Sequence, residues 1–160
     1  MNDFFTKTDL SRKDAENIIS ETLNKCDDGE LYLENSKSES IVLDDNKIKS
    51  SSYSSDLGYG LRAVTGEVVA YSHSNEISKN SLKQSADNLS STLKSKKGVY
   101  NHEIPKTNEK FYKNINPIEE KSLQSKLELL KEVNNYTRAK SGIVQQVTAS
   151  FSGEHKSIEI

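Results

Sequence analysis

The side chains that could bind a metal or act in catalysis are few and widely separated in this sequence. The three histidines are His73, His102 and His155, and the single cysteine is Cys26. None of them has the spacing of a zinc or calcium motif, because no second histidine follows within a helical turn and no cysteine pair exists. Glu154 beside His155 is half of a metal motif, but it falls in a predicted hairpin. The residues therefore predict no metal ligand and no catalytic group.

Three glycines and one arginine are concentrated in residues 58–75. A Gly-x-Gly that binds phosphate opens a helix, whereas Gly58 and Gly60 lie within a predicted strand, so we interpret these glycines and Gly66 as forming a bulge and a turn. Arg62 is the one charged side chain of that strand. We predict that it pairs with a carboxylate on the outer face of the sheet. The alternative, anchoring a peptide, makes Arg62 the only candidate for substrate binding.

The same stretch predicts a β-hairpin. Its sequence, GYGLRAVTGEVVAYSHSN, places Tyr59, Leu61 and Ala63 on one face of a strand and the intervening side chains on the other. Thr65 and Gly66 interrupt this pattern, and residues 67–73 resume it. We therefore predict two antiparallel strands joined by a short turn, in the middle of a sheet.

Helical spacing of apolar residues predicts three helices. The first is capped by Ser11 and ends near Lys25, with Cys26 as a small core residue at the edge of its apolar stripe. The second follows caps at Asn75 and Ser78 and closes within residues 94–98. The third covers residues 118–139, and its predicted apolar stripe consists of Leu123, Leu127, Leu130, Val133 and Tyr136.

Further strands are predicted on both sides of these helices. They cover residues 30–36, 38–44, 47–55, 143–150 and 156–160, with turns at Asp45–Asn46 and at Ser152–Gly153. We interpret the serine run at 50–55 as a water-facing edge strand and not as a linker. Residues 99–117 have no periodicity and predict a mobile connector. The fold class is therefore α+β, with a mostly antiparallel sheet of about six strands and three helices packed against it.

Length and composition restrict the kind of protein. A chain of 160 residues predicts a single domain over 1–160. The net charge of -2 gives no basis for binding nucleic acid, and no apolar run or basic leader suggests a membrane or secretion. A single cysteine excludes an intramolecular disulfide. We expect a cytoplasmic protein with no nucleic-acid or membrane partner.

Several blocks of the sequence resemble one known family. Gly-Tyr-Gly-Leu-Arg-Ala-Val-Thr-Gly at 58–66, then Ala-Tyr-Ser at 70–72 and Asn-Glu-Ile-Ser at 75–78, look like the N-terminal domain of the TldD/PmbA family of zinc metallopeptidases. The remaining matching blocks, in the order of the family, are residues 32–34, 116–118, 126–133 and 144–153. The Arg-Ala-Val-x-Gly strand is closer to the TldD branch than to PmbA.

The resemblance implies a function that this sequence can carry only in part. Family members are much longer, and their zinc site, a His-Glu-x-x-x-His helix with a later cysteine, has no counterpart in residues 1–160. The chain also stops inside its last predicted strand, so we expect an N-terminal piece, truncated before the zinc-binding domain, with no catalytic residue, metal ligand or cofactor of its own. The family degrades or trims small unfolded peptides as two-subunit assemblies.

Two hypotheses follow for the function of the chain. In the first, it is the non-catalytic part of a TldD-like peptidase, and its partners are a catalytic C-terminal half or a PmbA-like or TldD-like subunit. In the second, it is a stand-alone module for peptide binding or dimerisation, or a remnant of a split gene without function. An adjacent zinc motif in the genome favours the first.

Overall fold

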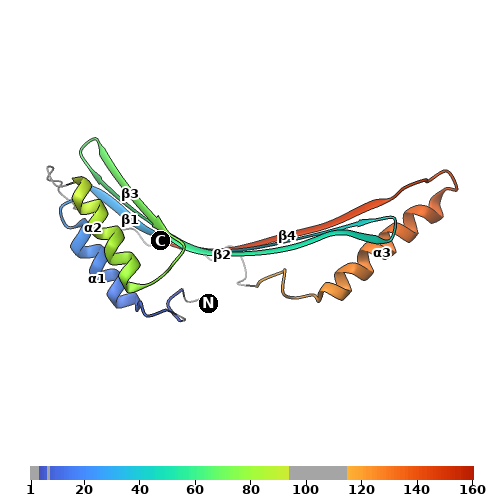
Figure 1. The fold of residues 1–160 in the computed structure, drawn as a ribbon, viewed down its shortest axis with the longest axis horizontal. Coiled ribbons are helices and arrows are strands. Elements are labelled where there is room, and N and C mark those ends of the chain that lie inside the picture. Colours follow the sequence, from blue (N-terminus) through green and yellow to red (C-terminus); the bar gives the residue numbers. More distant parts are fainter. Residues whose placement is uncertain (1–3, 7, 94–114) are drawn as a thin grey trace. The chain divides into compact units, whose positions relative to one another are not determined.

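The computed structural model describes residues 4–6, 8–93 and 115–160, and within them the chain has an α+β fold (Figure 1). The described elements are α1 (Arg12–Leu23), β1 (Asp28–Asp44), β2 (Lys47–Thr65), β3 (Val68–Ser74), α2 (Lys79–Leu93), α3 (Leu123–Lys140) and β4 (Thr148–Glu159). The strands form one sheet in the order β3-β2-β1-β4. The predicted fold class and the three helices are confirmed.

Two compact units share the two longest strands. Unit 1 comprises Met1–Asn35, Asp56–Lys113 and Ser157–Ile160, and unit 2 comprises Ser36–Ser55 and Asn114–Lys156. Both β1 and β2 therefore contribute residues to each unit. The single domain that we predicted for residues 1–160 stays a prediction.

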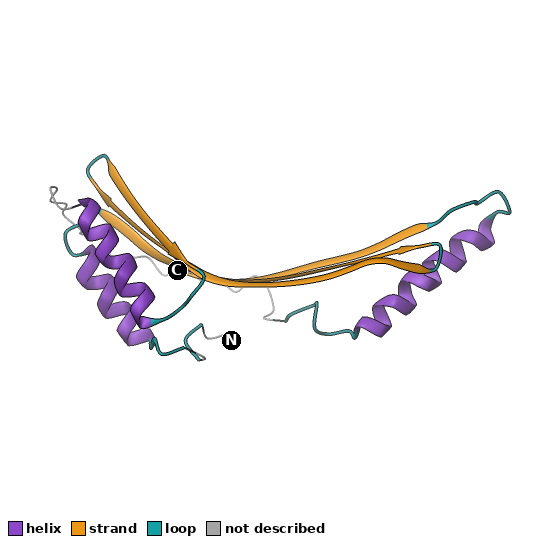
Figure 2. Cartoon of the chain, viewed as in Figure 1, coloured by secondary structure: helices purple, strands orange, loops and turns teal. Residues whose placement is uncertain are grey.

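In unit 1, α1 and α2 cover one face of the strands (Figure 2). The Ser11 hydroxyl accepts a hydrogen bond from the Asp14 N–H at 3.1 Å, which confirms the predicted cap of α1. Leu61 of β2 and Leu82 of α2 have no exposed surface, and Cys26 is buried as predicted. Burial of these apolar side chains provides the main stabilisation of the unit.

The predicted hairpin at Thr65–Gly66 is confirmed. Strands β2 and β3 pair antiparallel without interruption from Tyr59 opposite Ser74 to Thr65 opposite Val68. Gly66 has φ of +60°, a left-handed conformation that glycine adopts without steric cost. Its N–H also donates to a carboxylate oxygen of Asp27 at 2.6 Å, which holds the turn against the segment that joins α1 to β1.

The sheet has four strands and not the predicted six. Strand β1 runs through both of the segments 30–36 and 38–44, and β2 runs through both 47–55 and 58–65. No proline lies between them, so every backbone N–H along these strands can still join the ladder. The predicted turn at Asp45–Asn46 is confirmed, with positive φ at both residues, as in a two-residue hairpin turn.

The last strand also differs from the prediction. Residues 143–147 lie outside β4, and Ser152–Gly153 do not form a turn but continue the strand. Turn-forming residue types are a weak signal where a long partner strand is available, and β1 supplies one here. As predicted, residues 47–55 of β2 are exposed, and no described strand lies on their outer edge.

In unit 2, α3 packs on the sheet through a face that differs from the predicted one. The helix begins at Leu123 and not at Ile118, because the Ser122 hydroxyl accepts from the Ser125 N–H and caps it. Leu127 and Leu130 pack against Ile41 and Leu43, and Ala149 and Phe151 of β4 belong to the same cluster.

Three of the residues predicted for the apolar stripe of α3 are exposed, namely Leu123, Val133 and Tyr136. The polar residues Lys126 and Asn134 are buried in their place. Most of the predicted connector 99–117, and the predicted end of the second helix at 94–98, lie outside the described residues. Within the part that is described, no helix is long and apolar enough to cross a membrane.

Candidate binding site

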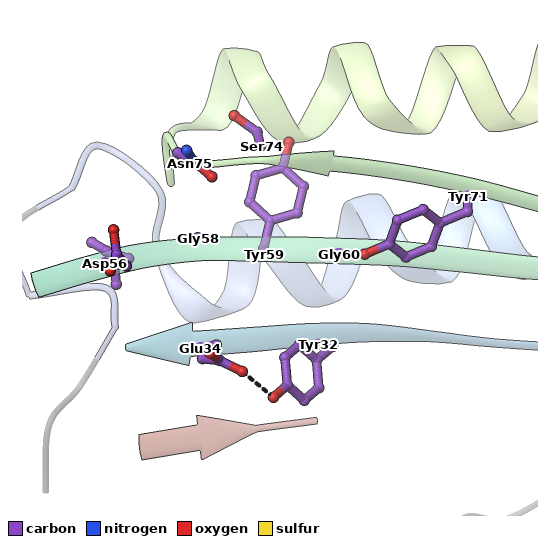
Figure 3. Close-up of a pocket in the computed structure, with 10 residues that line it drawn as sticks. Tyr32, Glu34, Asp56, Gly58, Tyr59, Gly60, Tyr71, Ser74 and Asn75 are labelled. Atoms are coloured by element: carbon purple, nitrogen blue, oxygen red, sulfur yellow. Dashed lines mark hydrogen bonds between the residues drawn. The ribbon is translucent and has the colours of Figure 1, made fainter. Parts of the chain in front are cut away.

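A small hollow opens in unit 1 beside the end of β3, over the middle parts of β1 and β2 (Figure 3). Its volume is about 210 Å³, and its lining residues come from β1, β2, β3 and the residue that follows β3. The residues are Tyr32, Glu34, Asp56, Leu57, Gly58, Tyr59, Gly60, Tyr71, Ser74 and Asn75. Two carboxylates and the phenols of Tyr32 and Tyr71 therefore border a space large enough for a side chain or a short peptide segment.

Glycine forms the floor of the hollow because a side chain would not fit there. A Cβ added to Gly60 would lie 2.5 Å from the Tyr71 hydroxyl, and one added to Gly58 would lie 2.7 Å from the Ser74 carbonyl oxygen. Gly60 pairs with His73 in an unbroken register, so the predicted bulge is wrong at this residue. The absent Cβ allows the Tyr71 ring to lie across the backbone of β2.

Tyr59 points from the hollow towards α2 and anchors the strand (Figure 3). Its hydroxyl lies 2.9 Å from the hydroxyls of both Ser81 and Ser85. Ser85 is also bonded to the Ser72 hydroxyl of β3, at 3.0 Å. This partly buried chain of hydroxyls holds β2 and β3 against α2, because each polar group finds a partner there.

Tyr32 and Glu34 form the outer wall, where the phenol donates a short hydrogen bond to the carboxylate (Figure 3). The two residues are two positions apart on β1, so their side chains lie on the same face of the strand. The hydrogen bond to Glu34, followed by burial, raises the pKa of Tyr32 to about 12. The phenol is therefore a neutral donor at physiological pH and not a nucleophile.

Replacing Glu34 by glutamine is expected to lower the pKa of Tyr32 from about 12 towards its ordinary value of about 10. The raised pKa stabilises the folded protein fully at pH values below the ordinary tyrosine pKa of about 10. This contribution is lost as the pH rises through the pKa of the folded state, about 12. NMR titration of ring-labelled tyrosine measures the change, and the Tyr32→Phe variant assigns the signal. An unchanged pKa in Glu34→Gln would show that burial, and not the carboxylate, causes the shift.

Arg62, the only substrate-binding candidate from the sequence, lies outside this hollow. Its guanidinium pairs with Asp28 at 2.6 Å and with Glu30 at 3.0 Å, both on β1. These two hydrogen bonds, first that of Asp28, hold the pKa of Arg62 above its ordinary value. The predicted pairing with a carboxylate is confirmed, whereas the peptide-anchoring alternative stays untested.

The Arg62→Met variant is expected to lose about 1 kcal/mol of stability or less, because all three charged groups are partly exposed to water. The loss should shrink at high salt, which screens exposed ion pairs. Urea unfolding at low and high salt measures both effects. A variant with unchanged stability and weakened peptide binding would instead favour the anchoring role.

The histidines do not converge on a site. His73 of β3 stacks on Tyr71, with ring centroids 5.8 Å apart, while His155 lies on β4 in unit 2 and His102 lies outside the described residues. Glu154 and His155 are neighbours on a continuous strand, so their side chains point to opposite faces. Among the described residues, no group of histidine, cysteine or carboxylate side chains could hold a metal.

The groups that line the hollow are hydrogen-bond acceptors, phenols and exposed backbone. Carboxylates and phenols beside an open glycine backbone suit an amine or an amide N–H of a peptide. Tyr32, Glu34, Asp56 and Tyr71 could not be predicted as a site from the sequence, because they come from three strands whose register the sequence does not specify. One sequence feature indicates the site: Gly60 lies within a strand, and its missing side chain leaves room for the Tyr71 ring of the neighbouring strand.

Comparison with known proteins identifies this domain. Residues 29–93, from the start of β1 to the end of α2, match the family model described as PmbA/TldA metallopeptidase domain 1. A metalloprotease TldD homolog from Buchnera aphidicola (subspecies Acyrthosiphon pisum) is 36% identical over 133 residues, which cover 82% of this chain and 28% of that protein. The chain belongs to the TldD/PmbA family.

Further TldD/PmbA relatives agree over nearly the whole chain. The metalloprotease TldD homolog of Haemophilus influenzae is 32% identical, over 99% of this chain and 34% of its own length. TldE from Thermococcus kodakarensis has the same fold, with a TM-score of 0.57 at 15% identity, over 91% of this chain and 34% of that chain.

A Bacteroides thetaiotaomicron protein described as a candidate modulator of DNA gyrase also shares the fold. Its TM-score is 0.60 at 20% identity, over 92% of this chain and 38% of that chain. This TldD/PmbA chain thus spans about a third of the length of the curated relatives that it matches.

Proposed function

We propose that this chain forms the N-terminal, non-catalytic part of a TldD-like zinc metallopeptidase that degrades or trims small unfolded peptides. The observation that carries the proposal is the match of residues 29–93 to domain 1 of the family, together with TldD homologs about three times as long as this chain. The chain contributes the sheet and helices of that domain. Peptide cleavage belongs to the remainder of the longer protein.

The described residues do not fit a zinc ion. Zinc in a catalytic site takes three protein ligands from histidine, carboxylate or cysteine side chains. Here His73 stacks on Tyr71, Cys26 is buried in the apolar core, and His155 belongs to the other unit. No catalytic step is therefore assigned to the residues of this chain.

The partners that we propose are a catalytic C-terminal part, in the same or a separate polypeptide, and a PmbA-like or TldD-like subunit. Similarity to TldD homologs and to the fold of TldE supports both. We place this assembly in the cytoplasm. Neither nucleic acid nor a membrane enters the proposal, since the net charge of the chain is only -2.

Reconstitution tests this proposed function. The chain is mixed with the portion of the Haemophilus influenzae relative that lies outside the matched region, and cleavage of unstructured fluorogenic peptides is followed with and without zinc. The chain alone should be inactive, and the mixture should show zinc-dependent cleavage above that of the relative's portion alone. Cleavage by the isolated chain, or no gain on mixing, would contradict the proposal.

The hollow in unit 1 favours a second candidate function, peptide binding without catalysis. Its carboxylates and the exposed ring of Tyr71 offer polar and flat apolar contacts to an extended peptide. NMR titration with unstructured peptides should then shift the amide signals of Gly58 and Gly60, and the Tyr71→Ala variant should not respond. No shift in the unmodified chain would eliminate this candidate.

A further inference from the structure

A second and larger depression in unit 1 has no role in the function described so far. It is a groove of about 420 Å³ between α1 and β1, and most of its lining is apolar. The apolar residues are Phe5, Ala15, Ile19, Leu23, Leu31, Leu33 and Ile160. Arg12, Glu16 and Glu159 stand among the charged groups of its lining. An apolar groove with a charged rim is typical of a surface that another segment covers.

Strand β4 leads into this groove. The Asp45 N–H donates to the Val147 carbonyl oxygen at 3.0 Å, and Gly153 lies beside Glu39, so the antiparallel ladder puts Glu159 opposite Leu33. Strand β4 ends at Glu159. Past Glu159, no described strand lies beside residues 29–31 of β1 on the edge that β4 occupies further along.

The geometry at the mouth of the groove fixes the direction of any added strand. Arg12 of α1 forms an ion pair with Glu159, so the end of β4 is held at the groove. Residues 29, 31 and 33 of β1 face α1, since side chains alternate along a strand. A segment that continues the line of β4 would therefore direct every second side chain into the groove.

Gly29 closes the far end of the groove. A Cβ at this position would lie 2.5 Å from a methyl group of Leu23 and 2.8 Å from the Arg62 carbonyl oxygen, so β1 and α1 are in close contact there. The open edge is thus only a few residues long. A strand of that length presents about two side chains to one face.

We propose that this groove receives a short apolar β-strand from the remaining two-thirds of a TldD-like polypeptide, paired with residues 29–31 of β1 in line with β4. This inference rests on the proposed function, because it assigns the occupant to the longer protein. Burial of about two side chains is too little to offset the freedom that a separate peptide loses on binding. A segment of the same polypeptide has already lost most of that freedom.

The test uses the full chain extended by the short segment that follows the matched region in the Haemophilus influenzae relative. Amide hydrogen exchange at residues 29–31 should become about tenfold slower or more than in the chain itself. Ser20 lines the groove and is exposed, whereas its neighbour Glu21 is exposed and does not line it. The Ser20→Trp variant of the extended chain should lose the protection, and Glu21→Trp should keep it.

Exchange of the α2 amides shows in each variant that unit 1 remains folded. Unchanged exchange at residues 29–31 in the extended chain would overturn the proposal, and so would protection that survives in Ser20→Trp. Equal protection by the same segment added as a separate equimolar peptide would also overturn it, because the groove would then be a site for free peptides. The exchange measurement requires neither zinc nor cleavage. If reconstitution failed while residues 29–31 were still protected in the extended chain, only the proposed function would be contradicted.

Discussion

Replacing Lys126 by methionine is expected to destabilise unit 2 by about 3–5 kcal/mol, the usual cost of removing one partner from a buried ion pair. The Lys126 ammonium lies 2.5 Å from a Glu39 oxygen and 2.6 Å from the Ile118 carbonyl oxygen. The exposed fractions of the two side chains are only 5% and 10%. Methionine keeps most of the volume but leaves the Glu39 carboxylate buried without its counterion. Exchange of the α3 amides should accelerate about a hundredfold or more.

The double variant Lys126→Met with Glu39→Leu separates the charge effect from the packing effect. It should recover most of the lost stability, because two apolar residues can replace a buried ion pair at little net cost. Lys131→Met, at an exposed position of the same helix, is the matched control and should change stability by less than about 0.5 kcal/mol. A single variant as stable as this control would mean that the ion pair does not hold the loop at Ile118 against the sheet.

Truncating Leu61 to alanine is expected to cost unit 1 about 3–5 kcal/mol, the range for large-to-small changes in a core. Leu61 has no exposed surface and lies in β2 among the buried side chains of α1, α2 and β3. Deleting its outer methyl groups loses the free energy of transferring them from water to the core. The cavity that remains also loses van der Waals contacts among the surrounding side chains. Urea unfolding followed by circular dichroism, with exchange of the α2 amides, measures the loss.

Leu57→Ala is the matched control for this change, since Leu57 lies on the same strand with 40% of its surface exposed. It should cost less than about 1 kcal/mol. The α3 amides of unit 2 report whether the effect stays within unit 1. Equal costs for the two leucines would contradict the core that we assign to this unit.

Features set by local chemistry could be predicted from the sequence. Ser11 caps α1, Asp45–Asn46 forms one hairpin turn, and Gly66 lies in the other directly after Thr65. Cys26 is buried. Each of these features depends on a few neighbouring residues. The family blocks around Gly58–Gly66 led to the correct domain for the same reason.

Features set by long-range pairing could not be predicted. The continuity of β4 through Gly153 depends on the length of β1, and the burial of Lys126 depends on Glu39, which lies 87 positions away. The hollow depends on register, since Tyr32 and Tyr71 reach the same space only when their strands lie on either side of Gly60. No periodicity within one segment contains this information.

If this chain supplies only scaffold to a TldD-like peptidase, the purified protein should not retain zinc. Zinc content after dialysis against excess metal and then buffer, measured by atomic absorption, tests this most directly. Only trace zinc is expected, with no change in the His73→Ala and His155→Ala variants. Stoichiometric zinc that disappears when either histidine is replaced would show that the chain carries its own metal site, and the assignment as a non-catalytic part would be wrong.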